Sequence, residues 1–208
     1  MFFDFFNFFS KKKEIVKMDK KLLCALVIGH KKSSPGAYND YYDLYEYHFN
    51  EELAIDIELE LSNSPDVDIQ KIYRRTYTQL PHDINDLNPD FIISLHCNAF
   101  NKQAKGCEVL YYHRSNTGKQ LASILQKNLL QIIPNNKHNR GIMPITSEDR
   151  GGYLLKNTNA PCLIAEPFFI DNTSELKIIL QDREPIIKAY SKAIQEIANF
   201  LKKESQNG

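Results

Sequence analysis

Short apolar segments alternate with longer amphipathic segments along most of the chain. Apolar runs of the length of a buried strand, bounded by turn residues, occur at Leu22–Ile28, Val67–Tyr73, Phe91–Leu95, Cys107–Tyr112 and Cys162–Phe169. Between and after these runs, apolar residues recur every three or four positions, which predicts helices at Glu46–Leu61, Gly118–Ile133, Ser174–Leu180 and Glu184–Lys203. Strands that alternate with helices predict an α/β fold: a single domain with a mixed, mostly parallel, twisted sheet of about six strands and helices on both faces.

Three stretches lack such a pattern. Lys31–Tyr45 is polar with a Ser-Pro-Gly turn signal, and Asn135–Gly152 is rich in turn residues, so we expect both to be loops. The chain begins with six phenylalanines among its first ten residues, followed by three lysines. This order is the reverse of a secretory signal peptide, and no cleavage pattern of small residues follows. We therefore expect a disordered extension at 1–20 and one folded domain at 21–205; a membrane-surface or partner-binding tail is the alternative.

The composition excludes several classes of function. The chain has 208 residues, of which 42% are hydrophobic and 25% charged, as in ordinary globular domains. Its 26 basic and 26 acidic side chains give a formal net charge of zero, so the charge balance does not favour nucleic acid as a partner. No apolar run reaches the roughly 20 residues that span a bilayer, so we expect no transmembrane segment. The four cysteines form no CxxC pair and are expected to be reduced core residues.

Residues that bind metals or transfer protons follow three of the predicted strands. His30, His96 and Glu166 each lie at the point where an apolar run ends. In α/β sheets, ligands bind outside the carboxyl ends of the strands. A lone histidine at such a position is more often a structural residue paired with a carbonyl group. Three such residues at equivalent positions indicate an active site.

A catalytic zinc ion usually has three protein ligands and one open position for water. His30 and His96 supply two ligands, and Glu46, at the start of a predicted helix, supplies a carboxylate that the positive end of the helix dipole keeps ionised. His48 is a rival ligand, but a residue two positions along projects about 200° around the helix. The structural alternative is that Glu46 is only a helix-start acid.

Glu166 has two interpretations of its own. A carboxylate directly after a buried strand is either a structural ion-pair partner or a general acid/base in a partly desolvated site. A hydrolytic zinc site needs such a group beside its water. The remaining histidines have no matching partners in the sequence, and we expect them to be surface residues.

Several motifs follow one another in a characteristic order: Gly29-His30 with Pro35-Gly36-Ala37, Glu46-x-x-x-Asn50, Ser94-Leu95-His96-Cys97-Asn98-Ala99, Gly106-Cys107-Glu108-Val109, Arg140-Gly141, and Ala165-Glu166-Pro167-Phe168 with Asn172. Together they resemble the zinc-dependent N-acetylmuramoyl-L-alanine amidases of the amidase-3 type, which are cell-wall hydrolases of bacteria and their phages. The resemblance covers roughly residues 21–203. Three features depart from the family pattern: Phe168 replaces a common glycine, Asp171 replaces a usual serine, and Lys31-Lys32 stands where glycine often follows the histidine.

The resemblance implies a function and a role for each site residue. Zinc would be held by His30, Glu46 and His96, and Glu166 would be the general base and acid. The substrate would be peptidoglycan, cleaved between the lactyl group of N-acetylmuramic acid and the first L-alanine of the stem peptide. We expect a monomer that is made in the cytoplasm without a recognisable signal peptide and acts at the bacterial cell wall after release or lysis, as a phage lysin or a bacterial enzyme.

Two other classes of function stay open at this point. A zinc exopeptidase, or another zinc amidohydrolase on a related α/β fold, would use the same ligands with a cation for a terminal carboxylate, which Arg140 or Lys156 could supply. A non-catalytic wall-binding module would be expected to lack a ligand or Glu166, and the sequence lacks neither.

Overall fold

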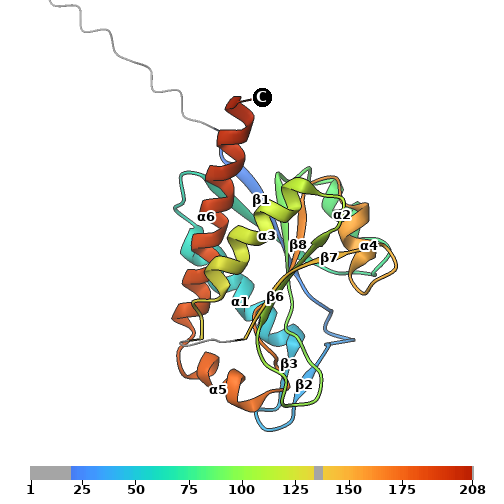
Figure 1. Ribbon diagram of the computed structural model, residues 1–208, viewed down its shortest axis with the longest axis vertical. Coiled ribbons are helices and arrows are strands. Elements are labelled where there is room, and N and C mark those ends of the chain that lie inside the picture. The colour runs from blue at the N-terminus through green and yellow to red at the C-terminus, as the bar shows by residue number, and fades with distance from the viewer. Residues whose placement is uncertain (1–19, 134–137, 208) are drawn as a thin grey trace, which may run out of the picture.

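The computed structural model describes residues 20–133 and 138–207 (Figure 1). The extension expected at 1–20 lies, apart from Lys20, outside these residues. None of the helices in the described ranges combines the length and the apolar character needed to cross a lipid bilayer.

A six-stranded sheet forms the centre of the molecule. Its strands lie in the order β4 (Val67–Tyr73), β1 (Leu22–Ile28), β5 (Phe91–Leu95), β8 (Cys162–Glu166), β6 (Cys107–Tyr112) and β7 (Asn139–Ile145). All neighbours pair in parallel except β6 and β8, which are antiparallel. The prediction of a mixed, mostly parallel sheet of about six strands is confirmed.

Helices cover both faces of this sheet, as the alternation of the sequence predicts (Figure 1). One face packs against α1 (Glu46–Leu61), α3 (Asn116–Leu129) and α6 (Glu184–Asn207), with α5 (Thr173–Gln181) at its lower end. The other face packs against two short helices, α2 (Leu80–Asn85) and α4 (Gly152–Asn157). The two faces therefore differ greatly in the amount of helix that covers them.

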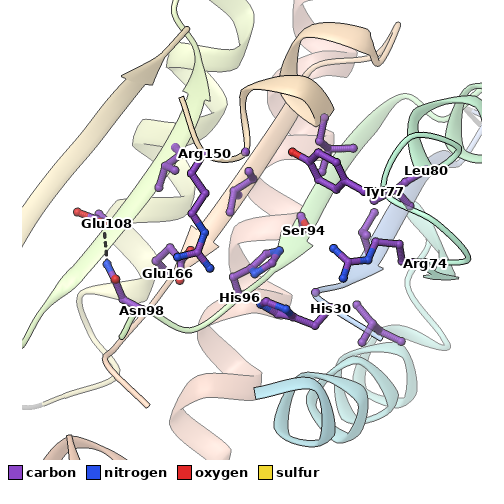
Figure 2. Close-up of a pocket in the computed structure, with 17 residues that line it drawn as sticks. His30, Arg74, Tyr77, Leu80, Ser94, His96, Asn98, Glu108, Arg150 and Glu166 are labelled. Atoms are coloured by element: carbon purple, nitrogen blue, oxygen red, sulfur yellow. Dashed lines mark hydrogen bonds between the residues drawn. The ribbon is translucent and has the colours of Figure 1, made fainter. Parts of the chain in front are cut away.

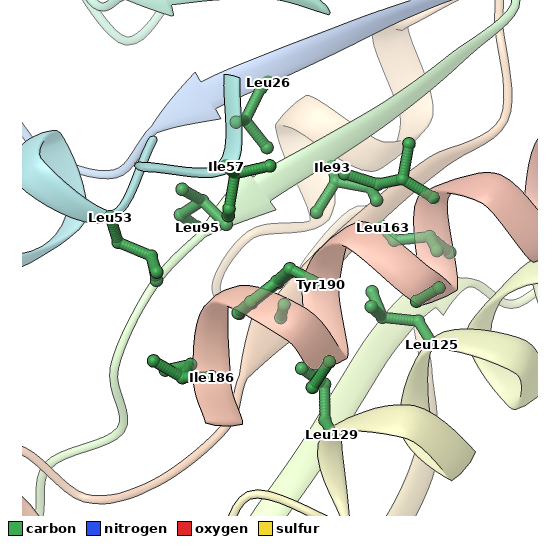
Figure 3. Close-up of a cluster of buried hydrophobic side chains, with 14 of the residues drawn as sticks. Leu26, Leu53, Ile57, Ile93, Leu95, Leu125, Leu129, Leu163, Ile186 and Tyr190 are labelled. Carbon is green, nitrogen blue, oxygen red and sulfur yellow. The ribbon is translucent and has the colours of Figure 1, made fainter. Parts of the chain in front are cut away.

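The larger core lies under α1, α3 and α6 (Figure 3). Leu26 and Ile93 from the sheet meet Ile57, Leu125 and Tyr190 from the three helices, and all five are fully buried. Each large apolar side chain removed from water in this way stabilises the fold by roughly 1.5–3 kcal/mol. Most of the buried apolar side chains therefore lie on this side of the sheet.

Successive strand residues point to opposite faces, so the same strands also supply a second, smaller cluster. Val27, Ile92 and Ile164 face α2 and α4, where they pack with Leu80 and Leu154. Because two six-residue helices cannot cover the whole face, the smaller cluster leaves room for a cavity beside it.

The expectation that Asn135–Gly152 is a loop is wrong for part of that range. Residues 139–145 form β7, which pairs only with β6 at the edge of the sheet and is mostly exposed, so no continuous apolar run marks it. Lys31–Tyr45 likewise contains a small hairpin, β2 (Tyr38–Asn39) with β3 (Leu44–Tyr45). Short or edge strands need little apolar burial, and the hydrophobic pattern misses them for that reason.

Two predicted boundaries also shift. The helix expected from Gly118 begins at Asn116, because the Ser115 hydroxyl caps it by accepting a hydrogen bond from the Gly118 N–H. The last strand ends at Glu166 rather than Phe169, since Pro167 has no N–H to continue the ladder.

Candidate active site

Four neighbouring parallel strands, β4, β1, β5 and β8, end at one edge of the sheet. The residues at or just beyond these four ends are, in strand order, Arg74, His30, His96 and Glu166. They line one cavity on the face covered by α2 and α4 (Figure 2). The alignment of strand ends that the sequence suggested is therefore the arrangement that the fold produces.

Glu46, the first residue of α1, lies between the two histidines. Its Oε2 is 2.9 Å from His30 Nε2, and its Oε1 is 3.0 Å from His96 Nδ1. The ligand atoms of His30, Glu46 and His96 all lie within 4.8 Å of one another. The structure thus brings the three residues proposed from the sequence into one cluster.

The Glu46 carboxylate is held from both sides by the backbone. Its Oε1 accepts a hydrogen bond from the Cys97 N–H at 3.0 Å, and its Oε2 accepts one from the Ala37 N–H at 3.2 Å. Burial alone would raise the pKa of this carboxyl, but the contacts with His30 and His96 outweigh burial and lower the pKa. Glu46 is therefore a buried carboxylate whose charge is retained and whose oxygens are fixed in direction.

The turn after β1 fits closely around this carboxylate. Gly36 has a φ of +83°, and a Cβ added there would lie 2.6 Å from Glu46 Oε2 and 2.7 Å from His30 Cδ2. Only glycine leaves the space that the two side chains occupy. The Pro35-Gly36 turn signal in the sequence thus has a direct structural role at the cluster.

The cluster fits a zinc ion by its donor set and by one unpaired atom. Two imidazole nitrogens and a carboxylate are typical ligands of catalytic zinc, and ligands about 2 Å from the metal lie about 3.3 Å apart in tetrahedral geometry. Among the described residues, the buried His30 Nε2 forms no hydrogen bond of acceptable geometry, although Glu46 Oε2 is 2.9 Å away, so this ring nitrogen is available to another atom. His48, the rival ligand, instead lies against Tyr45 and Tyr47.

Glu166 stands apart from this cluster in the same cavity. Its Oε2 is buried, and none of the residues that the structure describes forms a hydrogen bond with it. Burial raises the pKa of the Glu166 carboxyl well above its usual value, the charge of Glu46 adds to this effect, and Arg150 opposes it. A carboxyl with these properties can hold or release a proton, which is what a general acid/base requires.

The far wall of the cavity contains a polar network. Glu108 accepts hydrogen bonds from Asn98 Nδ2 at 2.6 Å and from Arg140 Nε at 2.7 Å. Glu108 is directly opposite Glu166 in the antiparallel pairing of β6 and β8. The network fixes the turn after His96, because Asn98 also accepts a hydrogen bond from the Ala99 N–H.

The cavity has a volume of about 250 Å³ and contains two residues that we did not single out from the sequence, Arg74 and Arg150. Arg74 follows β4 directly, so the strand-end argument that found His30 would also have found it. Arg150 lies in the segment before α4, where no pattern indicated a site. Arg140 is paired with Glu108 and Lys156 is exposed outside the cavity, so neither is placed to bind a terminal carboxylate there.

The sequence profile of the N-acetylmuramoyl-L-alanine amidase family (amidase-3) matches residues 24–196, which include the three clustered residues and Glu166. The chain belongs to this amidase family. Peptidoglycan amide hydrolysis is accordingly its activity, which decides against the exopeptidase and the non-catalytic module. A search of curated protein sequences finds no match.

Solved structures of amidases share the fold. An N-acetylmuramoyl-L-alanine amidase from Clostridium difficile 630 has a TM-score of 0.75 at 20% identity, over 88% of this chain and 97% of its own. The catalytic domain of CwlV from Paenibacillus polymyxa has a TM-score of 0.74 at 18% identity, over 86% and 98%. The CwlD amidase of Clostridioides difficile, solved in complex with the GerS lipoprotein, has a TM-score of 0.72 at 23% identity, over 86% and 100%.

Proposed function

We propose that this amidase cleaves the bond between the lactyl group of N-acetylmuramic acid and L-alanine with a zinc ion held by His30, Glu46 and His96, and with Glu166 as the proton-transferring group. The observation that carries the proposal is the convergence of the three ligand atoms within 4.8 Å in a cavity that also contains Glu166. Zinc, when bound, supplies Lewis acidity toward the scissile carbonyl and lowers the pKa of a water.

The side chains of the chain perform the remaining tasks. Glu46 keeps its charge and orientation through the Ala37 and Cys97 N–H groups, so it can hold a cation without rearranging. Glu166 accepts the proton of the attacking water and returns it to the leaving amine of L-alanine. A nearby cation favours the ionised form of a carboxyl, so a metal ion and Arg150 together act against the burial that raises the Glu166 pKa.

We further propose that the protein acts at the bacterial cell wall, after release from the cytoplasm or on lysis, because its substrate is the wall polymer. A monomeric state, with the folded domain at 21–205, is part of the same proposal. The sedimentation behaviour of the purified protein tests the monomer, and the fate of the protein in fractionated cells tests its location.

Metal analysis combined with mass spectrometry of digested peptidoglycan tests the proposed function. The protein should carry about one zinc per chain, as a three-ligand catalytic site does. Digestion should release stem peptides with a free L-alanine amine and leave the glycan strands intact. Full zinc occupancy in a His30→Ala, His96→Ala double variant, or products cut at any other bond, would contradict the proposal.

A further inference from the structure

Two cationic side chains enter the active-site cavity from opposite sides. Figure 2 shows Arg74 on the side of His30 and Arg150 on the side of Glu166, with His96 between them. Within residues 20–133 and 138–207, neither guanidinium group forms a hydrogen bond or an ion pair. Arginine side chains in a pocket usually meet an anion, so the partners of these two groups need to be identified.

The acids of the cavity do not serve as that partner for Arg74. Glu46 is occupied by two backbone N–H groups and two histidines, and Glu108 is occupied by Asn98 and Arg140. Glu166 lies on the opposite side, where its attractive electrostatic interaction is with Arg150. Among the described residues, these contacts leave Arg74 without a hydrogen-bonded or ion-paired acid, and only the charge of Glu46 acts on it from a distance.

Arg74 is held in place by its surroundings rather than by an anion. Its side chain is half-buried, and its guanidinium lies 5.9 Å from the centre of the Tyr77 ring. Burial lowers the pKa of this guanidinium, which shows that its charge is partly removed from water without full compensation. A preorganised and incompletely compensated guanidinium is suited to bind a carboxylate through two parallel hydrogen bonds.

The surface beyond Arg74 continues this positive character. Arg74 also lines a second, more open cavity of about 460 Å³, whose other lining residues are Lys31, Lys32, Ser33, Tyr47 and Tyr73. Of the residues in the described ranges, no acidic one lines that cavity. A substrate chain that extends from the His–Glu–His cluster on the His30 side therefore passes Arg74 and enters a surface region with positive side chains.

We propose that Arg74 binds a free carboxylate of the stem peptide, and that Lys31 and Lys32 extend this anion-binding surface along the peptide. The inference rests on the proposed function, because the scissile amide must lie between His96 and Glu166 for the peptide to reach Arg74. Stem peptides carry carboxylates that some cell walls leave free and others convert to amides. Arg74 is accordingly a specificity-determining residue that favours stems with free carboxylates.

The test compares one polymer in two charge states. Peptidoglycan sacculi are stripped of phosphate-containing polymers, and half of the preparation is amidated with carbodiimide and ammonia, which neutralises the carboxylates. Wild type, Arg74→Gln and Arg74→Lys are assayed on both substrates for released L-alanine amines. Arg75→Gln is the matched control, because Arg75 is the next residue, is exposed, pairs with Asp83 and lines neither cavity.

Wild type should cleave the unmodified sacculi with a kcat/KM about 10- to 100-fold higher than the amidated ones, the range expected for one charge-assisted contact. Arg74→Gln should lose that factor on unmodified sacculi, mainly through KM, and should act like wild type on amidated sacculi. Arg74→Lys should keep part of the preference, and Arg75→Gln all of it. Equal rates of wild type on the two substrates, or an equal loss of Arg74→Gln on both, would overturn the proposal.

Failure of the proposed function is distinguishable from failure of this inference. If wild type releases no L-alanine amine from either substrate, the proposed function is wrong. If it cleaves both substrates with the same kcat/KM, only the role of Arg74 is wrong. Thermal midpoints of all variants identify any loss that comes from unfolding. Sacculi that keep their phosphate-containing polymers are assayed beside the stripped ones. If these polymers change kcat/KM more than amidation of the carboxylates does, the surface binds wall phosphate instead, which also overturns the proposal.

Discussion

Glu46 and Glu166 are carboxylates at the same edge of one sheet, yet their environments are opposite. Both oxygens of Glu46 accept backbone hydrogen bonds and face histidines, and its pKa is lowered. Glu166 has a buried oxygen without a hydrogen-bond partner in the described part of the chain, and burial raises its pKa. One carboxyl is fixed as an anion, whereas the other is left able to exchange a proton.

The difference comes from what surrounds each group. Glu46 begins α1, where the helix dipole and the N–H groups of Ala37 and Cys97 favour a negative charge. Glu166 ends a buried strand next to apolar residues and near two other acids, Glu46 and Glu108, which disfavour its charge. The same residue type is thus suited to hold a metal at one position and to transfer protons at the other.

The largest effect should follow from Glu46→Gln. An amide carries no charge for the metal, and its NH₂ group would face one of the N–H donors of Ala37 or Cys97. We expect loss of zinc together with several kcal/mol of transition-state stabilisation, which corresponds to about 10³-fold or more in rate. Zinc analysis and peptidoglycan turnover measure both losses.

A control on the same helix makes this test specific. Glu60→Gln removes an exposed carboxylate of α1 that pairs with Lys188 far from the cavity, and it should leave zinc content and turnover near wild type. If Glu46→Gln retained full zinc while His48→Ala lost it, the wrong residue of α1 has been assigned as the ligand.

Glu166→Gln should separate the two carboxyl groups. It preserves shape but removes the group that moves the proton, and general acid/base residues typically contribute about 10²–10⁴-fold to the rate. Turnover should fall by that factor while zinc content stays unchanged. A folded, zinc-loaded and fully active Glu166→Gln enzyme is the result that would remove this residue from the mechanism.

Much of this arrangement could be predicted from the sequence, because strong physical signals mark it. The core strands β1, β5 and β8 are continuous apolar runs, and His30, His96 and Glu166 stand where those runs end. Because parallel strands have their carboxyl ends at the same edge of a sheet, parallel pairing alone brings these residues together. The start of α1 was equally clear, since its apolar stripe begins near Glu46.

Other parts had no such signal. β7 is an exposed edge strand containing Pro144, and two of the contacts of Glu46 are with backbone N–H groups, which no residue type encodes. Arg150 reaches the cavity through a loop, so only the fold places it there. Local sequence therefore predicts which strands carry chemistry, whereas the fold decides which groups complete the site.

The pH dependence of stability should sharpen the contrast in metal-free protein. The raised pKa means that the folded state binds the Glu166 proton more tightly than the unfolded state does. Its contribution to stability is thus present below the unfolded pKa of 4.5 and is lost as the pH rises through the raised folded pKa. Each unit of difference corresponds to about 1.4 kcal/mol.

Metal-free Glu166→Gln should therefore lose less stability than metal-free wild type as the pH rises above the unfolded pKa of 4.5. Urea unfolding of the two proteins at a series of pH values measures this difference. Titrating groups elsewhere in the chain contribute equally to the free energy of unfolding of both proteins, so their contributions cancel. If the free energies of unfolding of both proteins change with pH in parallel, the ionised form of Glu166 is not destabilised in the folded state.

The smallest effect should follow from Cys97→Ala, which tests how Glu46 is held. The N–H of residue 97 donates to Glu46 Oε1, whereas the thiol is buried against Asn50 Oδ1 at 3.7 Å and lies outside the His–Glu–His cluster. Alanine keeps the N–H and loses only the sulfur, at a stability cost of about 1 kcal/mol for the small void. Zinc content should be unchanged and turnover within about threefold of wild type, since uniform effects below 1 kcal/mol change rates by less than about fivefold.

Burial also raises the Cys97 pKa well above that of a free thiol, so the residue is a poor nucleophile or ligand at neutral pH. A hundredfold loss of turnover in a folded, zinc-loaded Cys97→Ala protein would show that the side chain takes part, and that the environment of Glu46 is not set by backbone donors alone.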